Sequence, residues 1–200
     1  MELNSEVERE EAFKSAVQAF RWAARRAFQL GLQAGAGGNI SLRLGPDRFL
    51  TKPTGLGLTE CRGANLVRVN GQGQPVEGQA KPTKEVMAHL GIYEVRPEVG
   101  GIVHYHPPYA TAYAVRNLPL PLPTLHARRV LKQVPLLPEY PEGSHELAQA
   151  VREAARDPEV SGLLLAGHGL LAMGPSLRQA QYTAELMEES ARIAWLARFI

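Results

Sequence analysis

Apolar residues at helical spacing occupy both ends of the chain. Near the N-terminus they are Phe13, Val17, Phe20, Ala24, Ala27 and Phe28. Because these positions lie three and four residues apart, they predict an amphipathic helix over residues 6–33, with Ser5 and Glu8 as a capping box at its start. A similar pattern predicts a final helix over residues 176–199.

Between these helices, short apolar runs bounded by Gly, Pro and Asn predict β-strands. The predicted strands cover residues 39–44, 48–51, 65–69, the run that ends at His104, the run that ends at Ala166, and residues 170–173. After the third run, the turn Gly71-Gln72-Gly73 predicts that the chain returns as a hairpin.

Three shorter helices are predicted between the strands. The first follows Thr83, which can act as its N-cap, and it ends at Arg96-Pro97. The other two cover residues 108–115 and 144–155. The Pro-rich segment 117–141 predicts short strands and loops.

The order of these elements indicates the fold class. Single strands alternate with helices, but many connections are too short for parallel crossovers, so a mixed α/β sandwich is favoured over a doubly wound sheet. No repeat or composition change divides the 200 residues, and we therefore expect one domain over residues 1–200.

The composition excludes several classes of protein. The chain is 44% hydrophobic and 21% charged, as expected of a globular domain. A formal net charge of +2 is too small to indicate binding to nucleic acid or to an anionic membrane. The single cysteine, Cys61, excludes an internal disulfide and fits a reducing compartment. The acidic N-terminus resembles no signal peptide, and no apolar run approaches the ~20 residues of a membrane span, so we expect a cytoplasmic protein.

Three histidines in two short motifs carry the strongest chemical signal. His104 and His106 end one strand-like run, and His168 lies between two glycines after another. Alternate residues of a strand share a face, so His104 and His106 can point the same way. A His-x-His pair with a third histidine from elsewhere is the ligand set of an open zinc site.

The alternative interpretation is structural, because a single buried histidine at a strand end is more often a hydrogen-bonded core residue. The paired spacing and the flanking glycines, which give a ligand room to approach, favour the metal site for His104, His106 and His168. We expect His89 on a helix face, His126 in a loop and His145 in a first helical turn to be structural or exposed.

Glu85 lies early in a predicted helix, after Thr83 and Lys84. A helix N-terminus offers free N–H groups to a phosphate, so Glu85 could act as a general base between phosphate and metal. The alternative is an ordinary first-turn glutamate that favours the helix dipole. Residues 35–39 and 52–55 could also form anion-binding loops. Neither matches a Walker or dinucleotide motif, and each taken alone is more often a plain tight turn.

Taken in order, five segments resemble the class II aldolase/adducin family. They are Gly38-Asn39-Ile40-Ser41, Pro53-Thr54-Gly55, Pro82-Thr83-Lys84-Glu85, His104-Tyr105-His106-Pro107 and His168-Gly169. Glu85 lies nineteen residues before His104, and the segments extend over most of the chain. Within the family, the aldolases that cleave L-fuculose 1-phosphate are the most similar.

The resemblance implies a three-layer α/β/α sandwich with a central, mostly antiparallel sheet, and a tetramer with active sites between subunits. It implies one Zn²⁺ per subunit, bound by His104, His106 and His168. Glu85 would be a fourth ligand and the catalytic acid/base. The implied phosphate-binding residues are Gly38, Asn39, Thr54, Gly55, Thr83 and Lys84.

The implied reaction cleaves a phosphorylated ketose to glycerone phosphate and an aldehyde, without a Schiff-base lysine. A decarboxylase of a 3-oxo sugar-acid phosphate and a dehydratase of a thiosugar phosphate would use the same metal, loops and glutamate, so both stay as alternatives. A non-catalytic, adducin-like interaction domain is the alternative from another class, and the intact set of histidines argues against it.

The chain departs from the aldolases of this family at one catalytic position. They use a tyrosine from a neighbouring subunit to protonate the leaving aldehyde oxygen, but the matching residue here is Ala127. Tyr105 and Tyr140 are the candidates to replace it. Lys84 stands in place of a usual serine, and Gly167 in place of a common asparagine. The proton donor and the sugar therefore stay open.

Overall fold

A computed structural model describes residues 6–76 and 78–200. Its centre is a seven-stranded sheet with the order β3-β2-β1-β4-β7-β6-β5, antiparallel except between β5 and β6. The strands are β1 Asn39–Gly45, β2 Arg48–Thr51, β3 Val67–Val69, β4 Gly101–Tyr105, β5 Leu136–Leu137, β6 Gly162–Leu165 and β7 Gly169–Gly174. The expected α/β class and mostly antiparallel sheet are confirmed.

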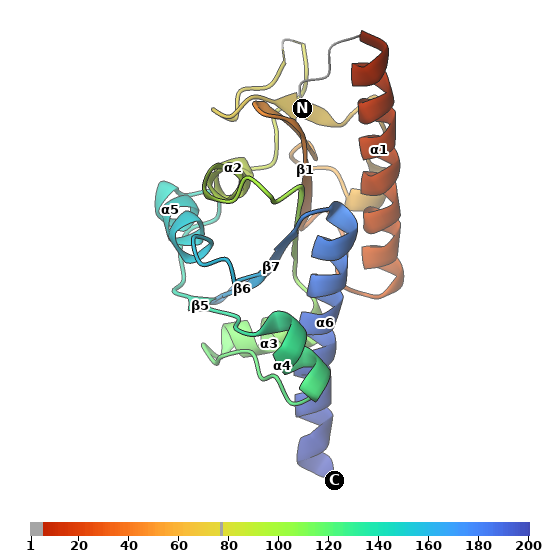
Figure 1. The fold of residues 1–200 in the computed structure, drawn as a ribbon. Coiled ribbons are helices and arrows are strands. Elements are labelled where there is room, and N and C mark those ends of the chain that lie inside the picture. Colours follow the sequence, from red (N-terminus) through yellow and green to blue (C-terminus); the bar gives the residue numbers. More distant parts are fainter. Residues whose placement is uncertain (1–5, 77) are drawn as a thin grey trace.

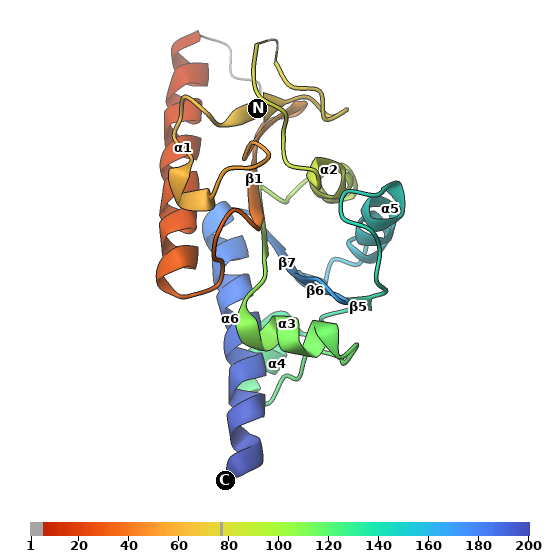
Figure 2. The same ribbon diagram turned by 180° about the vertical axis from the view of Figure 1, so that it is seen from behind.

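Within residues 6–76 and 78–200, six α-helices flank the sheet. They are α1 Glu6–Gln29, α2 Val86–Val95, α3 Pro108–Val115, α4 Leu125–Leu131, α5 His145–Ala154 and α6 Leu177–Leu196, with short 3-10 turns at Leu58–Glu60 and Ala197–Phe199. Helices α1 and α6 lie on one side of the sheet, and α2 and α5 lie on the other (Figures 1 and 2). None of the helices in the described part of the chain could cross a membrane, given their lengths and hydropathy.

Alternation along the central strands supplies an apolar core to each side of the sheet. Val103 and Tyr105 of β4 pack in the cluster that contains residues of α1 and α6. Ile102 packs in the cluster that contains residues of α2 and α5. Because alternate residues share a face, His104 points to the same side as Ile102, toward α2. The alternation therefore places the first histidine of the motif opposite the start of α2.

The structure corrects the prediction for the Pro-rich segment, which contains helix α4. The side chain of Thr124 accepts a hydrogen bond from Ala127 N at 3.0 Å, and Ala127 and Leu131 are buried. An N-cap and a short apolar face therefore suffice for a helix of seven residues. His126 lies exposed on this helix, and the prediction that it lies in a loop was wrong.

The predicted boundaries also shift at three helices. Helix α1 ends at Gln29, and its predicted capping box involves Ser5, which lies outside the described residues. Helix α6 ends at Leu196. The prediction that Thr83 is the N-cap of α2 was wrong, because the helix begins at Val86 and the N–H of Thr83 donates to Lys52 O at 2.9 Å in the segment before it. The N-cap is Glu85, so Glu85 immediately precedes the helix.

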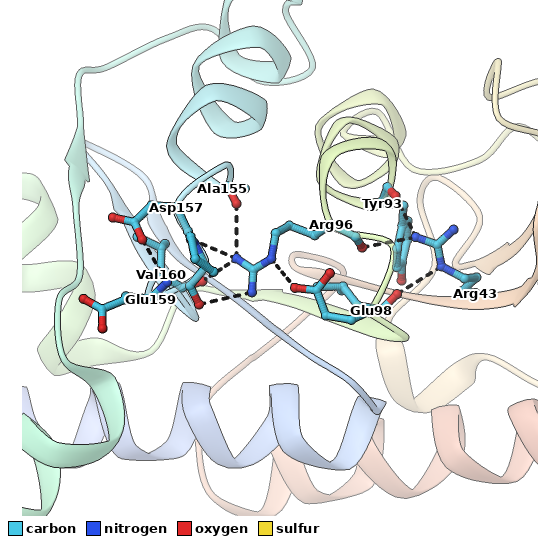
Figure 3. Close-up of polar contacts among 10 residues, drawn as sticks. Arg43, Tyr93, Arg96, Glu98, Ala155, Asp157, Glu159 and Val160 are labelled. Carbon is cyan, nitrogen blue, oxygen red and sulfur yellow. Dashed lines mark hydrogen bonds and ion pairs between the residues drawn. The ribbon is translucent and has the colours of Figure 1, made fainter.

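A partly buried arginine connects the ends of α2 and α5 (Figure 3). Arg96 Nη1 donates to the carbonyl oxygens of Ala155, Asp157 and Val160 at 3.1, 2.9 and 3.1 Å. Its Nε forms an ion pair with Glu98. Carbonyl oxygens of the α5 C-cap and of the loop after it thus receive donors from one guanidinium, which fixes the end of α5 beside the end of α2.

Candidate active site

The sheet brings the three histidines of the motifs together. His104 is the fourth residue of β4, His106 follows the end of that strand, and His168 lies in the turn between β6 and β7. Since β4 pairs with β7, the turn and the strand end are neighbours. The three ring centroids lie 4.6 to 5.0 Å apart, and the three candidate ligand nitrogens lie within 4.8 Å of one another.

The hydrogen bonds orient these rings for metal binding. His104 Nδ1 lies 2.8 Å from Leu170 O, which can only accept, so the proton is on Nδ1 and Nε2 carries a lone pair. His104 Nε2 lies 3.2 Å from His168 Nε2, and His106 Nε2 is buried with no hydrogen-bond partner among the described residues. Burial lowers the pKa of His104 to about 3 and that of His106 to about 4, so both are neutral, as metal ligands must be. These donors fit a divalent cation.

Glu85 lies against the same cluster and is 7% exposed. Its Oε2 is 3.4 Å from His104 Nε2, and its Oε1 is 3.5 Å from His168 Nε2. Asn39 Nδ2 donates to Glu85 Oε2 at 2.9 Å. The carboxylate is therefore held beside the histidines, where it could be a fourth ligand or move a proton.

The predicted phosphate loops line one cavity with the histidines and Glu85. This cavity has a volume of about 250 Å³. Its lining includes every predicted phosphate-binding residue, namely Gly38, Asn39, Thr54, Gly55, Thr83 and Lys84. Two of the loops are joined because Thr54 N donates to Lys81 O at 3.0 Å. At Gly38, φ is +64° and a Cβ would lie 2.8 Å from His104 O, so the close approach of this loop requires glycine.

Lys52 and Glu142 also line the cavity, and neither is among the individual site residues predicted from the sequence. Lys52 is 3% exposed, its Nζ donates to Ala36 O at 2.5 Å, and burial lowers its pKa. The sequence already indicates the loop of residues 52–55 as a possible anion-binding loop, and Lys52 is its first residue. Glu142 Oε1 lies 3.8 Å from His168 Nε2. Glu142 precedes α5 in a loop without a motif, so no sequence signal pointed to it.

The remaining histidines lie outside the cluster, as expected. Within the described ranges, His104, His106 and His168 are the only group of three or more potential metal ligands. His89 is 1% exposed, and its Nδ1 lies 2.7 Å from Ser41 Oγ in the interior. His145 begins α5 and is exposed.

No tyrosine lines the cavity in the part of the chain that the structure describes. Ala127 is buried in α4. Tyr105 lies on the opposite face of the sheet from His104, and its hydroxyl donates to Gln181 Oε1 at 2.8 Å. Tyr140 packs against the apolar cluster between the sheet and helices α2 and α5. Neither Tyr105 nor Tyr140 lines the cavity of the candidate site.

Comparison with known proteins finds similar sequences and similar structures. The family model described as Class II Aldolase and Adducin N-terminal domain matches residues 18–195. An L-fuculose phosphate aldolase of Methanococcus maripaludis is 33% identical over 162 residues, which cover 81% of this chain and 86% of the relative. A 3-oxo-tetronate 4-phosphate decarboxylase of Escherichia coli is 34% identical over 175 residues, covering 84% and 81%. The crystal structure of YgbL from Escherichia coli superimposes with a TM-score of 0.84 at 30% identity, covering 92% of this chain and 90% of that one.

Proposed function

Since the chain belongs to the class II aldolase and adducin family, we propose that it is a metal-dependent lyase that acts on a phosphorylated sugar. The observation that carries the proposal is the position of Glu85, whose carboxylate lies 3.4 Å from His104 in a cavity that the candidate phosphate loops also line. We propose one Zn²⁺ per chain, bound by His104, His106 and His168, with Glu85 as a fourth ligand in the absence of substrate.

The proposed reaction is that of an aldolase, which cleaves a ketose phosphate similar to L-fuculose 1-phosphate into glycerone phosphate and an aldehyde. When bound, a divalent ion supplies Lewis-acid polarisation of the substrate carbonyl and stabilises the negative charge that develops there.

The residues of the chain position the substrate and move the proton. The loops that contain Gly38, Thr54 and Thr83 bind the phosphate and thereby fix the distance of the reacting carbons from Glu85. Cleavage of the C3–C4 bond leaves its electron pair on the fragment that carries the phosphate. Glu85 delivers a proton to C3 of that fragment, which completes glycerone phosphate. The hydroxyl group on C4 gives its proton to solvent water as the aldehyde forms, so one proton leaves at C4 for the one that Glu85 supplies at C3.

A decarboxylase is the second candidate, and one observation favours it. An aldolase must move a proton at the leaving oxygen, and no tyrosine lines the cavity within the described residues. Decarboxylation of a 3-oxo acid releases CO₂ and needs no such proton transfer. The decarboxylase from Escherichia coli is as similar to the chain as the aldolase is. A dehydratase would use the same metal and loops, but nothing in the cavity favours it. A non-catalytic interaction domain would not need the histidines and Glu85 together in one cavity.

Metal analysis followed by two substrate assays tests the proposal. We expect about one zinc ion per chain, and release of glycerone phosphate from L-fuculose 1-phosphate. Zinc with release of CO₂ from 3-oxo-tetronate 4-phosphate, and no glycerone phosphate, would replace the aldolase by the decarboxylase. A protein that binds no divalent metal would contradict both candidates.

The proposal extends to architecture, assembly and location. Helices on both faces of the sheet support the three-layer α/β/α sandwich, and the family match over residues 18–195 supports a single domain over residues 1–200. A homotetramer would bring a residue of a neighbouring subunit to the cavity, and sedimentation analysis tests that state. A cytoplasmic location stays a prediction of the sequence.

A further inference from the structure

One face of β1 forms an uninterrupted set of polar contacts with α2 and the residue before it. Asn39 Nδ2 donates to Glu85 Oε2 at 2.9 Å. Ser41 Oγ lies 2.7 Å from His89 Nδ1 and 2.9 Å from the Tyr93 hydroxyl. We call these three contacts, together with a fourth made by Arg43, the β1–α2 polar ladder.

The last contact of the ladder lies at the far end of α2 (Figure 3). Arg43 Nη2 donates to Tyr93 O at 2.7 Å, and the Arg43 guanidinium lies 4.8 Å from the centre of the Tyr93 ring. Residues 39, 41 and 43 of the strand thus meet residues 85, 89 and 93 of the helical segment. Glu85, the carboxylate in the candidate active site, occupies the first position of the ladder.

The regular pairing follows from backbone geometry. Two residues of a strand advance by about 6.7 Å, because the rise is about 3.3 to 3.4 Å per residue. Four residues of an α-helix advance by about 6.0 Å. Since the two repeats nearly coincide, alternate residues of β1 stay opposite every fourth residue of α2. Sliding either element by one residue would break all the contacts together.

These polar side chains are buried, so each hydrogen bond that is not formed lowers the stability of the folded state. Ser41, His89 and Tyr93 are 3%, 1% and 2% exposed. A buried polar group without a partner is unfavourable, whereas apolar side chains at these positions would pack in several registers. Directional hydrogen bonds therefore select one register of α2 on the sheet. The same register sets the position of Glu85, because the N–H groups of Ala88 and His89 donate to Glu85 O at 3.0 and 3.3 Å.

We propose that Ser41 and His89 are positioning residues for Glu85: their buried contact fixes the register of α2 on β1, and this register holds the Glu85 carboxylate beside the three histidines. Neither residue lines the cavity, so both act through Glu85 and not on the substrate. The catalytic part of this inference rests on the proposed function.

Two measurements on Ser41→Ala test the proposal. Hydrogen–deuterium exchange of the zinc-loaded protein should show faster exchange at the amides of Ala88 and His89. In turnover of the substrate that the wild-type protein cleaves, kcat should fall by at least about tenfold while KM and zinc content stay unchanged, since small displacements of a catalytic group cost this much. Because Ser41 acts through Glu85, adding Ser41→Ala to Glu85→Gln should cause no further loss.

Matched variants separate positioning from general packing. Ser190→Ala removes an equally buried serine hydroxyl from α6, where it has no hydrogen-bond partner among the described residues, and should change neither measurement. His89→Leu should behave like Ser41→Ala, whereas His89→Asn, which keeps a polar atom near the Nδ1 position, should recover most of kcat.

Three results would overturn the inference: unchanged exchange at Ala88 and His89, additive losses with Glu85→Gln, or equal effects of Ser190→Ala. If the wild-type protein turns over neither sugar phosphate, the proposed function fails, and the exchange data alone then decide whether the ladder fixes α2.

Discussion

Asn39 and His104 are direct partners across the β1–β4 ladder, so the amide that binds Glu85 and the first histidine of the cluster lie side by side on the sheet. Their side chains converge on one oxygen, since Glu85 Oε2 is 2.9 Å from Asn39 Nδ2 and 3.4 Å from His104 Nε2. The pairing of two strands therefore determines where the amide and the first histidine meet the carboxylate. The metal ligands, the carboxylate and the phosphate loops are different residues, so separate variants can test each of them.

The metal site predicts the behaviour of His104→Ala. This variant should lose its bound divalent ion and its activity while keeping the circular dichroism of the wild type, because a small side chain replaces one ligand at a strand end. Ligand binding to the native state stabilises it by about 2.7 kcal/mol at a hundredfold excess over Kd, so added zinc should raise Tm in the wild type only. The measurements are the zinc content of each protein and its Tm with and without added zinc. His145→Ala, at an exposed position, is the control and should behave like the wild type. Stoichiometric zinc in His104→Ala would refute the assignment.

Glu85→Gln should separate binding from catalysis. The amide keeps the size of the side chain but cannot move a proton, so turnover should fall by about 10²- to 10⁴-fold. Affinity for glycerone phosphate, measured by calorimetry on the zinc-loaded protein, should stay within a few-fold of the wild type. Glu146→Gln, on the exposed surface of α5, is the matched control. Turnover of Glu85→Gln close to that of the wild type would exclude Glu85 as the acid/base.

The two neighbouring lysines of the 81–84 segment should differ in their effect on substrate binding. Lys84 lines the cavity and Lys81 does not, although both are exposed. Lys84→Ala should raise KM for the sugar phosphate several-fold with little change in kcat, because the phosphate contact is made equally in the ground and transition states. Lys81→Ala should leave both constants unchanged. Equal KM values in the two variants would argue against a phosphate contact of Lys84.

Acid should destabilise the metal-free protein through its buried histidines. Burial lowers the pKa of His89 to about 3, whereas an unfolded histidine titrates near 6.5. Between these pH values the unfolded state binds more protons, so the free energy of unfolding falls as pH falls below about 6.5, by roughly 1.4 kcal/mol per pH unit for each such histidine. Denaturant titrations of the metal-free His89→Asn variant should show a slope shallower by about that amount. The exposed His126→Asn should keep the wild-type slope, and an unaltered slope in His89→Asn would show that His89 is not the titrating group.

Arg96 should matter for stability and not for chemistry. Arg96→Lys removes the planar group that donates to three carbonyl oxygens near the end of α5, and an ammonium cannot replace all three bonds. The free energy of unfolding should fall by about 2 kcal/mol, the scale of hydrogen bonds to charged groups. Chemical denaturation measures this loss, with the exposed Arg156→Lys as control. A loss no larger than that of the control would mean that the carbonyls find other donors.

Several features of the site could be predicted from the sequence because they depend on short-range patterns. The His-x-His spacing places His104 and His106 at a strand end, and the glycines beside His168 mark a turn. Helix α4 was not predicted because the Pro-rich composition of its surroundings favours loops. The opposing signals are weak: one N-cap, Thr124, and two buried apolar residues, Ala127 and Leu131. Glu142 could not be predicted because a glutamate in a loop has no periodicity, and only its neighbours in space give it a role. Lys52 belongs to the loop of residues 52–55 that the sequence already indicated, but its burial and its contact with Ala36 depend on the fold.

The sequence by itself determined most of the helices and strands of this protein, the family to which it belongs and the residue types that can bind a metal and a phosphate. The tertiary structure decided which of them meet. His104 and His168 are brought together by the β4–β7 pairing, and Glu85 joins them through α2 and its contacts with β1. The physical reason is that local propensity acts over a few residues, whereas the site depends on hydrogen bonds and packing between segments far apart in the chain.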